Sequence, residues 1–294
     1  MSKESFLQYL RFEKRYSPHT ITSYDNDLTQ FFTYLSTTYQ ITDVKAISHL
    51  QIRSWLVELM QQQITPRSIN RKISTLKSYF KFCVKNKLIE KDPMRKVLSP
   101  KTSKRLPVYV EQKNIRQVLD EFEYTNDYKG ARNHMIIELF YATGMRLSEL
   151  INIKLTDIDF YSGQMKVLGK GNKERLLPFN EQLKGEMKKY LAARETAFPS
   201  PKENFFFLTD TGNKMYARGV YRIVNELLQG FTTVDKKSPH VLRHTFATHL
   251  LNNGAEINAI KELLGHASLA ATQVYTHNSI EKLKEVYKQA HPKA

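Results

Sequence analysis

The side chains best suited to chemistry lie in one stretch, residues 238–277, which has the sequence SPHVLRHTFATHLLNNGAEINAIKELLGHASLAATQVYTH. They are two histidines, an arginine and a tyrosine: His240, Arg243, His266 and Tyr275. Two further basic residues, Arg146 and Lys170, stand earlier in the chain. Imidazole transfers protons near neutral pH, guanidinium groups bind phosphate through a planar fork, and a phenolic oxygen can act as a nucleophile. Together these groups fit attack of a phenolic oxygen on a phosphodiester, with the arginines neutralising the phosphorane.

The first part of this stretch is predicted to form a helix from Pro239 to Gly254. Ser238 is a preferred N-cap residue, proline suits the first helical position, and glycine suits the position just past the end. On a helical wheel, Arg243 and His240 fall within an apolar arc completed by Ala247 and Leu251, beside a face made of Leu242, Phe246 and Leu250. A cation in such an arc is costly unless an anion binds there, so an anion is expected at Arg243.

Each of these side chains also has an ordinary structural interpretation. Arg146, in YATGMRLSEL, is either a structural partner of Glu149 or an anion-binding arginine that this carboxylate holds in place. Lys170, in LGKGNKER, is either a surface lysine or a proton donor carried on a turn; the P-loop spacing is absent, so ATP binding is not expected. His266 could equally be a loop histidine, and Tyr275 a core tyrosine.

A zinc site is disfavoured, although His240 and His244 have the spacing of two ligands on one helix. Val241 replaces the glutamate of the HExxH motif, and no nearby carboxylate completes a ligand set. We therefore expect no metal and no other cofactor.

The charge balance points to a polyanionic partner. The chain has 45 Lys and Arg against 29 Asp and Glu, a net charge of +16, which favours nucleic acid or an acidic membrane surface. No apolar run approaches membrane-spanning length, and the start MSKESFLQYL lacks the apolar core of a signal peptide, so a cytoplasmic location is expected. The single cysteine, Cys83, excludes an internal disulfide and is predicted to be buried.

Residues 1–100 are predicted to be helical, and the helix from Pro66 to Asn86 is the most informative. One face is apolar (Ile69, Ile73, Leu76, Phe80, Cys83 and Val84), and the opposite face is basic (Arg67, Arg71, Lys77, Lys81 and Lys85). A solvated helix face usually alternates charge signs, whereas a face of one sign favours binding to phosphates. Basic residues of the following segment, Lys101, Lys104 and Arg105, are also candidate DNA contacts.

Composition divides the chain into a helical domain (1–97), a basic linker (98–107) and a second domain (108–294). The linker has prolines and serines without apolar periodicity. The second domain is predicted to contain a helix over 111–122, an apolar helix over 134–142 that Thr143-Gly144 interrupts, and a small antiparallel sheet between Ile158 and Leu177. A short strand is predicted at 205–208, and helices elsewhere.

Four segments carry a family resemblance. ATGMRLSEL, GKGNKER, SPHVLRHTFATHLLNNGA and LLGHASLAATQVYTH closely resemble the motifs of tyrosine recombinases, and within them the Xer type of site-specific recombinase. The resemblance covers essentially the whole chain, with the motifs in the family's order. It implies a mainly α protein: an N-terminal four-helix core-binding (SAM-like) domain and a mixed, mostly helical catalytic domain with a small antiparallel sheet, closing as a C-shaped clamp on DNA.

The resemblance also implies roles for individual residues. Arg146 and Arg243 are similar to the two catalytic arginines, His266 to a third phosphate-contacting group, and Glu149 to a supporting acidic position.

The proton-transfer groups and the nucleophile follow in the same way. His240 resembles the histidine that assists proton transfer, Lys170 the lysine that protonates the leaving 5′-oxygen, and Tyr275 the nucleophile that forms a 3′-phosphotyrosyl bond.

The partners that the resemblance implies are a double-stranded DNA recombination site and a tetramer that passes through a Holliday junction. That tetramer contains copies of this chain alone or a related recombinase, and a septal DNA translocase is a further implied partner. Resolution of chromosome dimers at cell division is the expected role. The alternatives are a mobile-element integrase, a type IB topoisomerase and a DNA-binding regulator without catalysis. The segment from Ser279 to Ala290 is expected to pack on its own domain or, as in resembling recombinases, on a neighbouring protomer.

Overall fold

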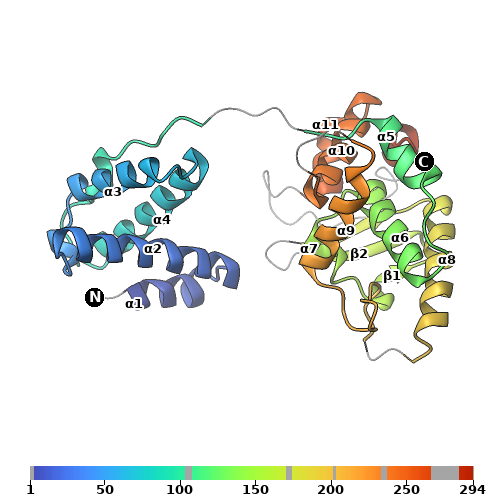
Figure 1. Cartoon of the computed structure of the whole chain (residues 1–294), viewed down its shortest axis with the longest axis horizontal. Coiled ribbons are helices and arrows are strands. Elements are labelled where there is room, and N and C mark those ends of the chain that lie inside the picture. The colour runs from blue at the N-terminus through green and yellow to red at the C-terminus, as the bar shows by residue number, and fades with distance from the viewer. Residues whose placement is uncertain are drawn as a thin grey trace. The chain divides into compact units, whose positions relative to one another are not determined.

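The structure, a computed structural model, describes residues 3–102, 108–169, 174–200, 203–232, 237–265 and 285–293. The chain forms two compact units, Met1–Arg105 (unit 1) and Leu106–Ala294 (unit 2), whose elements are drawn in Figure 1. Each unit has a hydrophobic core of its own. Both are mainly helical, as the sequence predicts, and the described strands all belong to unit 2.

The described residues of unit 1 form four α-helices: α1 (Lys3–Gln8), which continues as a π-helical turn over Tyr9–Glu13, α2 (Pro18–Tyr39), α3 (His49–Gln61) and α4 (Pro66–Lys85). Short 3₁₀ helices lie at Val44–Ala46 and Pro93–Lys96. The predicted start of α4 at Pro66 is confirmed, and α2, α3 and α4 are each capped, because the side chains of Ser17, Ser48 and Thr65 accept a hydrogen bond from a backbone N–H of the first turn. Residues 98–102 are neither helix nor strand.

Helix α4 has the two faces that its sequence predicts, with one correction. Ile69, Ile73, Leu76, Phe80 and Cys83 are buried, and burial raises the pKa of the Cys83 thiol. Val84 is 36% exposed, so its assignment to the apolar face was wrong. Phe82 packs there instead, with its ring centroid 5.4 Å from that of Phe6 and 5.0 Å from that of Tyr9.

The basic face of α4 is exposed but not wholly without acidic partners. Arg67, Lys77, Lys81 and Lys85 are exposed. Asp27 of α2, buried to 1% exposure, accepts hydrogen bonds from Lys72 and Thr75 at 3.0 Å each and from Arg71. A wheel of one helix cannot show this partner, because it comes from another helix.

Unit 2 begins with α5 (Gln112–Arg116), which continues as a π-helical turn over Gln117–Glu121, and with the apolar helix α6 (Tyr128–Thr143). Helix α6 begins earlier than predicted, at Tyr128 rather than His134, because Asp127 caps it by accepting the N–H of Gly130 at 2.7 Å. It ends where predicted: Gly144 adopts φ +59°, which favours glycine. The short helix α7 (Leu147–Leu150) follows.

The predicted small sheet is confirmed. Strands β1 (Ile158–Asp159), β2 (Gln164–Leu168) and β3 (Glu174–Pro178) are antiparallel in the order β1-β2-β3. Met165 pairs with Leu177, and these side chains are buried on the inner face. Arg175 pairs with the buried Val167 and shares that face, whereas Leu176 is only half-buried.

Four more helices complete this part of unit 2: α8 (Glu181–Ala197), α9 (Ala217–Gln229), α10 (Pro239–Asn252) and α11 (Ile257–Leu264). Residues 205–208 form two isolated bridges, Lys154 with Phe205 and Leu208 with Lys214, rather than the predicted strand. Helix α10 matches its prediction, since Ser238 caps its start and Gly254, at φ +88°, follows its end. Helix α6 packs against α8 and α10 (Figure 1). Its residues 135–143 are all buried. In the described ranges, no helix combines the length and apolarity needed to span a membrane.

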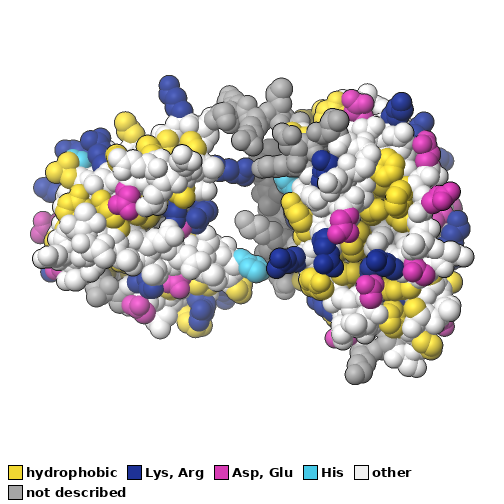
Figure 2. All heavy atoms as spheres, in the orientation of Figure 1, with side chains coloured by type: hydrophobic (Ala, Val, Ile, Leu, Met, Phe, Trp, Pro, Cys, Tyr) yellow, Lys and Arg dark blue, Asp and Glu magenta, His cyan; other side chains and the backbone are white. Residues whose placement is uncertain are grey.

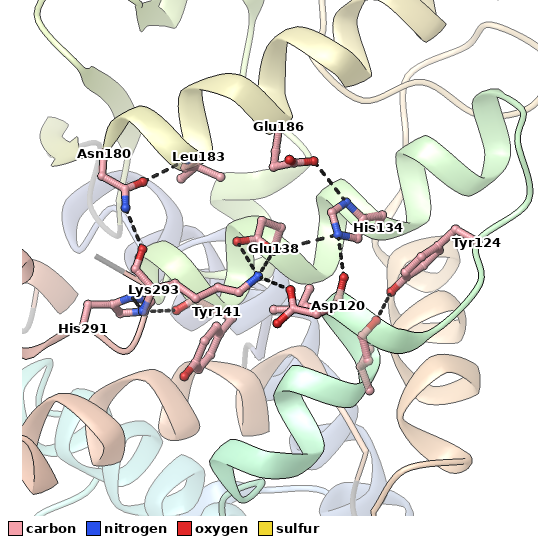
Figure 3. Close-up of polar contacts among 12 residues, drawn as sticks. Asp120, Tyr124, His134, Glu138, Tyr141, Asn180, Leu183, Glu186, His291 and Lys293 are labelled. Carbon is pink, nitrogen blue, oxygen red and sulfur yellow. Dashed lines mark hydrogen bonds and ion pairs between the residues drawn. The ribbon is translucent and has the colours of Figure 1, made fainter.

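The C-terminal residues pack on unit 2 of the same chain. Residues 285–290 are helical, and Tyr287, Ala290 and His291 are at most 5% exposed. Figure 3 shows the Lys293 ammonium between the carboxylates of Glu138 and Asp120, each 3.0 Å away. Residues 285–293 thus pack on the chain's own domain, residues 279–284 of the expected segment lie outside the described residues, and packing on a neighbouring protomer stays a prediction.

The His291 ring of this segment is held in one tautomer. Its Nδ1 accepts the backbone N–H of Lys293, so Nε2 carries the proton and donates to the carbonyl of Tyr141, both at 3.1 Å. Burial lowers the pKa of His291 to about 4, against the smaller opposing effect of the Tyr141 carbonyl. The ring is therefore neutral at physiological pH.

We expect the docking of residues 285–293 to depend on pH. A lowered folded-state pKa stabilises docking above the ordinary histidine pKa of 6.5, and the stabilisation, on the order of 3 kcal/mol, is lost as the pH falls from 6.5 toward 4. Hydrogen exchange of the amides of residues 285–290 should therefore be less protected at pH 5 than at pH 7, after correction for intrinsic rates. His291→Gln keeps an N–H donor for the Tyr141 carbonyl but does not titrate. An equal pH dependence in this variant would contradict the assignment to His291.

Candidate active site

Arg146 lies where α6 has ended and α7 begins. It is the N-cap residue of α7, and its backbone N–H donates to Oε2 of Glu149 at 2.7 Å while its guanidinium donates to Oε1 at 2.8 Å. A second guanidinium nitrogen donates to the carbonyl of Gly265 at 3.1 Å. The side chain stays 31% exposed, so Arg146 is held by the protein and can still contact a ligand. The predicted pairing with Glu149 is present.

Arg175 belongs to this group, although sequence reasoning did not select it. Its guanidinium makes a bidentate pair with Glu149, with Nη1 2.6 Å from Oε1 and Nη2 2.9 Å from Oε2. The residue is 5% exposed. The signal was available: the alternation of β3 puts position 175 on the same face as the buried Leu177, where a charged side chain needs a partner.

Glu149 is the acceptor that joins the two arginines. It is 2% exposed and accepts four hydrogen bonds, two from Arg146 and two from Arg175, which matches the acceptor capacity of a carboxylate. Burial alone would raise the pKa of Glu149, but the hydrogen bonds and charge of Arg175, together with the hydrogen bonds from Arg146, outweigh it and lower the pKa. Glu149 is thus ionised at neutral pH.

Arg243 is buried, as its place on the wheel predicted, but the expected anion is not what holds it. The guanidinium, in a residue 6% exposed, donates to the carbonyls of Gly144 and Leu264, both at 2.6 Å. These carbonyls lie at the C-terminal ends of α6 and α11, where unpaired acceptors and the negative end of the helix dipole favour a cation. The expectation that Arg243 requires a bound anion is therefore corrected.

Two glycines end the helices whose last carbonyls accept hydrogen bonds from Arg146 and Arg243. Gly144 and Gly265 both end a helix in the left-handed conformation, at φ +59° and +62°. A Cβ at Gly144 would lie 2.4 Å from Cδ1 of Phe246, and one at Gly265 would lie 3.0 Å from Cδ and Nη1 of Arg175. A larger residue at position 144 would therefore push against Phe246, and one at position 265 would push against Arg175.

The group carries excess positive charge. Among the residues that the structure describes, Glu149 is the one carboxylate paired with any of the three guanidiniums, and it pairs with those of Arg146 and Arg175, whereas Arg243 contacts carbonyls. Burial, followed by the like charges of Arg146 and Arg175, lowers the pKa of Arg243 to about 10, so it stays charged at neutral pH. The site favours an anionic ligand, and a phosphorane, with its added negative charge, more than a phosphodiester.

His240 lies one turn before Arg243 on α10 and is exposed, which corrects its expected place in an apolar arc. Leu251, expected in the same arc, is 51% exposed. The His240 and His244 Nε2 atoms are 3.1 Å apart. Within the described ranges, no third His, Cys, Asp or Glu joins them to form a metal-binding group.

The remaining predicted residues lie outside the described residues. They are Lys170, His266 and Tyr275 of the candidate active site and Lys104 and Arg105 of the candidate DNA contacts. In sequence, Lys170 falls between β2 and β3, and His266 directly follows Gly265, whose carbonyl contacts Arg146. The described part of the site thus contains Arg146, Glu149 and Arg243 together, with His240 on the same helix as Arg243.

Comparison with known proteins places this site in a family. The model of the phage integrase family matches residues 109–282, and that of the phage integrase N-terminal SAM-like domain matches residues 4–87. A protein of Anoxybacillus flavithermus named tyrosine recombinase XerC is 38% identical over 98% of this chain and 97% of its own. The Bacillus subtilis protein of the same name is 37% identical over 98% of this chain and 95% of its own.

Solved structures share the fold. XerH site-specific recombinase bound to palindromic difH substrate, in a post-cleavage complex, has a TM-score of 0.72 at 22% identity, over 97% of this chain and 83% of its own. The Tn1549 transposon integrase in complex with a circular intermediate DNA has a TM-score of 0.73 at 18% identity, over 95% of this chain and 97% of its own. The fold is thus that of a two-domain DNA integrase. With the family models and the relatives above 30% identity, the chain belongs to the phage integrase family, among the tyrosine recombinases of Xer type.

We expect Glu149→Gln to destabilise unit 2. An amide cannot accept four hydrogen bonds and leaves the buried guanidinium of Arg175 and the half-buried one of Arg146 without a counter-charge, so the free energy of unfolding should fall by about 3–5 kcal/mol. Denaturant unfolding measures this loss. The matched control is Glu226→Gln, since Glu226 is 67% exposed and 4.0 Å from Arg222, and its loss should stay below about 1 kcal/mol. Equal losses in the two variants would contradict the role given to Glu149.

Proposed function

We propose that this protein recombines DNA at a specific site by forming a transient covalent bond between Tyr275 and the DNA backbone. The observation that carries the proposal is the arginine group at Glu149, in which Arg146 and Arg243 are fixed by a carboxylate and by helix-end carbonyls. Fixed guanidiniums stabilise charge that develops in a transition state without reorganising during the reaction. Membership of the tyrosine recombinases supports the same chemistry.

The proposed reaction conserves bond energy. The Tyr275 oxygen attacks the scissile phosphorus and loses its proton, a 3′-phosphotyrosyl bond forms, and the bond to the 5′-oxygen breaks. Lys170 protonates the departing 5′-oxygen, and His240 assists proton transfer. Arg146, Arg243 and His266 contact the non-bridging oxygens. A 5′-hydroxyl of the partner duplex then reverses the step, so neither ATP nor a metal ion takes part.

DNA binding is proposed to involve both units. The exposed basic residues of α4, with Lys101, Lys104 and Arg105 of the linker, would contact phosphates, and the two units would close on the duplex as a clamp. Arg71 contributes less than its neighbours, because Asp27 already offsets its charge. Figure 2 shows Lys and Arg side chains on both units, with acidic side chains close to them on the visible face of unit 2. We assign residues 1–97 to the core-binding domain and 108–294 to the catalytic domain.

The proposed biological role is resolution of chromosome dimers at cell division, in the cytoplasm. The curated relatives named XerC support it, because they match over nearly the full length of this chain. The active assembly would be a tetramer on two DNA sites, formed by this chain alone or with a related recombinase, and a septal DNA translocase is a candidate regulator. Sequencing the DNA bound by the Tyr275→Phe protein in its own genome would separate this role from element mobility.

We expect Tyr275→Phe to abolish covalent attachment to DNA. A nicked suicide duplex, which loses its 5′-hydroxyl fragment after cleavage, should trap wild-type protein as an adduct that resists denaturing electrophoresis. Tyr221→Phe is the matched control, because Tyr221 is an exposed tyrosine of α9, and it should form the adduct at the wild-type rate. An adduct formed by Tyr275→Phe, or none formed by the wild type, would contradict the proposed function.

We expect Lys81→Ala to weaken binding to all DNA sequences alike. Losing one phosphate contact should reduce the slope of log K against log salt by about one unit. Titrations at several salt concentrations, with target and random duplexes, measure it. Lys189→Ala is the control, since Lys189 is exposed on α8 and paired with Glu186 at 2.8 Å. A loss confined to the target sequence would overturn the phosphate assignment for Lys81.

A further inference from the structure

We infer that Arg175 is a positioning residue for the cleavage reaction, which orients Glu149 and, through it, the guanidinium of Arg146. The inference rests on the proposed function, in which Arg146 binds the scissile phosphate. Arg175 itself is 5% exposed, and its contacts are with the protein. Its effect on the reaction is therefore indirect.

The geometry of the Glu149 carboxylate supports this role. Arg146 contacts both carboxylate oxygens from one side, one through its backbone N–H and one through its guanidinium. A carboxylate held only by these bonds could still rotate about its terminal torsion, because that torsion is soft. The bidentate pair with Arg175 fixes both oxygens in one plane. The direction in which Arg146 points thus depends on Arg175.

The charge of Arg175 also helps to hold Arg146 in place, because it keeps Glu149 ionised. Its hydrogen bonds and its charge are the largest of the effects that lower the pKa of Glu149 against the opposing effect of burial. Without Arg175, burial would favour the protonated carboxyl, which binds a guanidinium less strongly. Arg146 would then lose its counter-charge as well as its orientation.

A second contact links Arg175 to the helix end that holds both catalytic arginines. A Cβ at Gly265 would lie 3.0 Å from Cδ and Nη1 of Arg175, so this side chain packs directly against the end of α11. The carbonyls of Leu264 and Gly265 at this end accept hydrogen bonds from Arg243 and Arg146. Arg175 therefore contacts both supports of the arginine pair: the carboxylate and the helix end.

Stability alone explains Arg175 poorly. A buried ion pair is often no more stabilising than apolar side chains of similar volume, and the inner face of β3 otherwise carries the apolar Leu177. In addition, Nε of Arg175 is buried and finds no hydrogen-bond acceptor among the described residues. The bidentate pair of Arg175 with Glu149 is therefore better explained by the orientation that it imposes on this carboxylate.

The test compares Arg175→Met with Arg175→Lys in cleavage of the suicide duplex at pH values from 5.5 to 8.5. Arg175→Met should lower the cleavage rate about 10–100-fold, the size expected when a supporting partner of a site residue is removed. Its rate should fall further at acidic pH, as Glu149 takes up a proton. Arg175→Lys keeps the charge but not the bidentate fork, so it should restore part of the rate and remove the acidic decline.

The matched control is Arg194→Met. Arg194 is also buried in unit 2, at 4% exposure, but it donates to the carbonyls of Glu203 and Phe205 on another part of the unit. Its loss should lower the free energy of unfolding without changing the pH profile of cleavage. Should Arg175→Met fail to fold, Arg175→Lys still tests the inference, because the missing fork should lower its cleavage rate below that of the wild type.

A double-mutant cycle completes the test. In a Glu149→Gln background, Arg175→Met should cost little further rate, because its action passes through the carboxylate. Additive losses, or a folded Arg175→Met protein that cleaves at the wild-type rate and pH profile, would overturn the inference. Absence of a Tyr275-dependent adduct in the wild type would instead contradict the proposed function, so the two failures are distinguishable.

Discussion

The site depends on how this protein holds three buried or half-buried guanidiniums next to one another. Like charges at close range repel, and burial removes the water that would otherwise screen them. One carboxylate, Glu149, offsets part of this charge by accepting four hydrogen bonds from Arg146 and Arg175. Helix-end carbonyls at Gly144, Leu264 and Gly265 supply the rest for Arg146 and Arg243.

The need to offset the charge of these guanidiniums explains several features of unit 2. Helices α6 and α11 each end in a left-handed glycine, which leaves their last carbonyls free to accept from an arginine. Helix α7 is only four residues long, and its turn places the Glu149 carboxylate where it accepts hydrogen bonds from the backbone N–H and the guanidinium of Arg146. Because these supports compensate the charge only in part, the site retains a preference for an anion, which is what a phosphodiester-cleaving enzyme needs at its transition state.

Much of the fold could be predicted because its signals are local. Ser238 caps its helix where expected, and the alternation around Met165 and Leu177 predicts the sheet. The errors have a common cause. Val84 and Leu251 were assigned to apolar faces from the periodicity of one helix, yet which arc becomes buried depends on the elements that pack against it. The partner of Arg71, Asp27, could not be found in the same way, because it belongs to another helix.

The sequence by itself determined the types and order of the candidate site residues, the pairing of Arg146 with Glu149, and the burial of Arg243, since these follow from residue chemistry and short-range spacing. Only the tertiary structure decided what surrounds them. Arg175 reaches Glu149 from β3, and Arg243 reaches the ends of α6 and α11, across large separations in sequence. A buried charge must find acceptors wherever the fold supplies them, and periodicity within one element carries no information about acceptors on another.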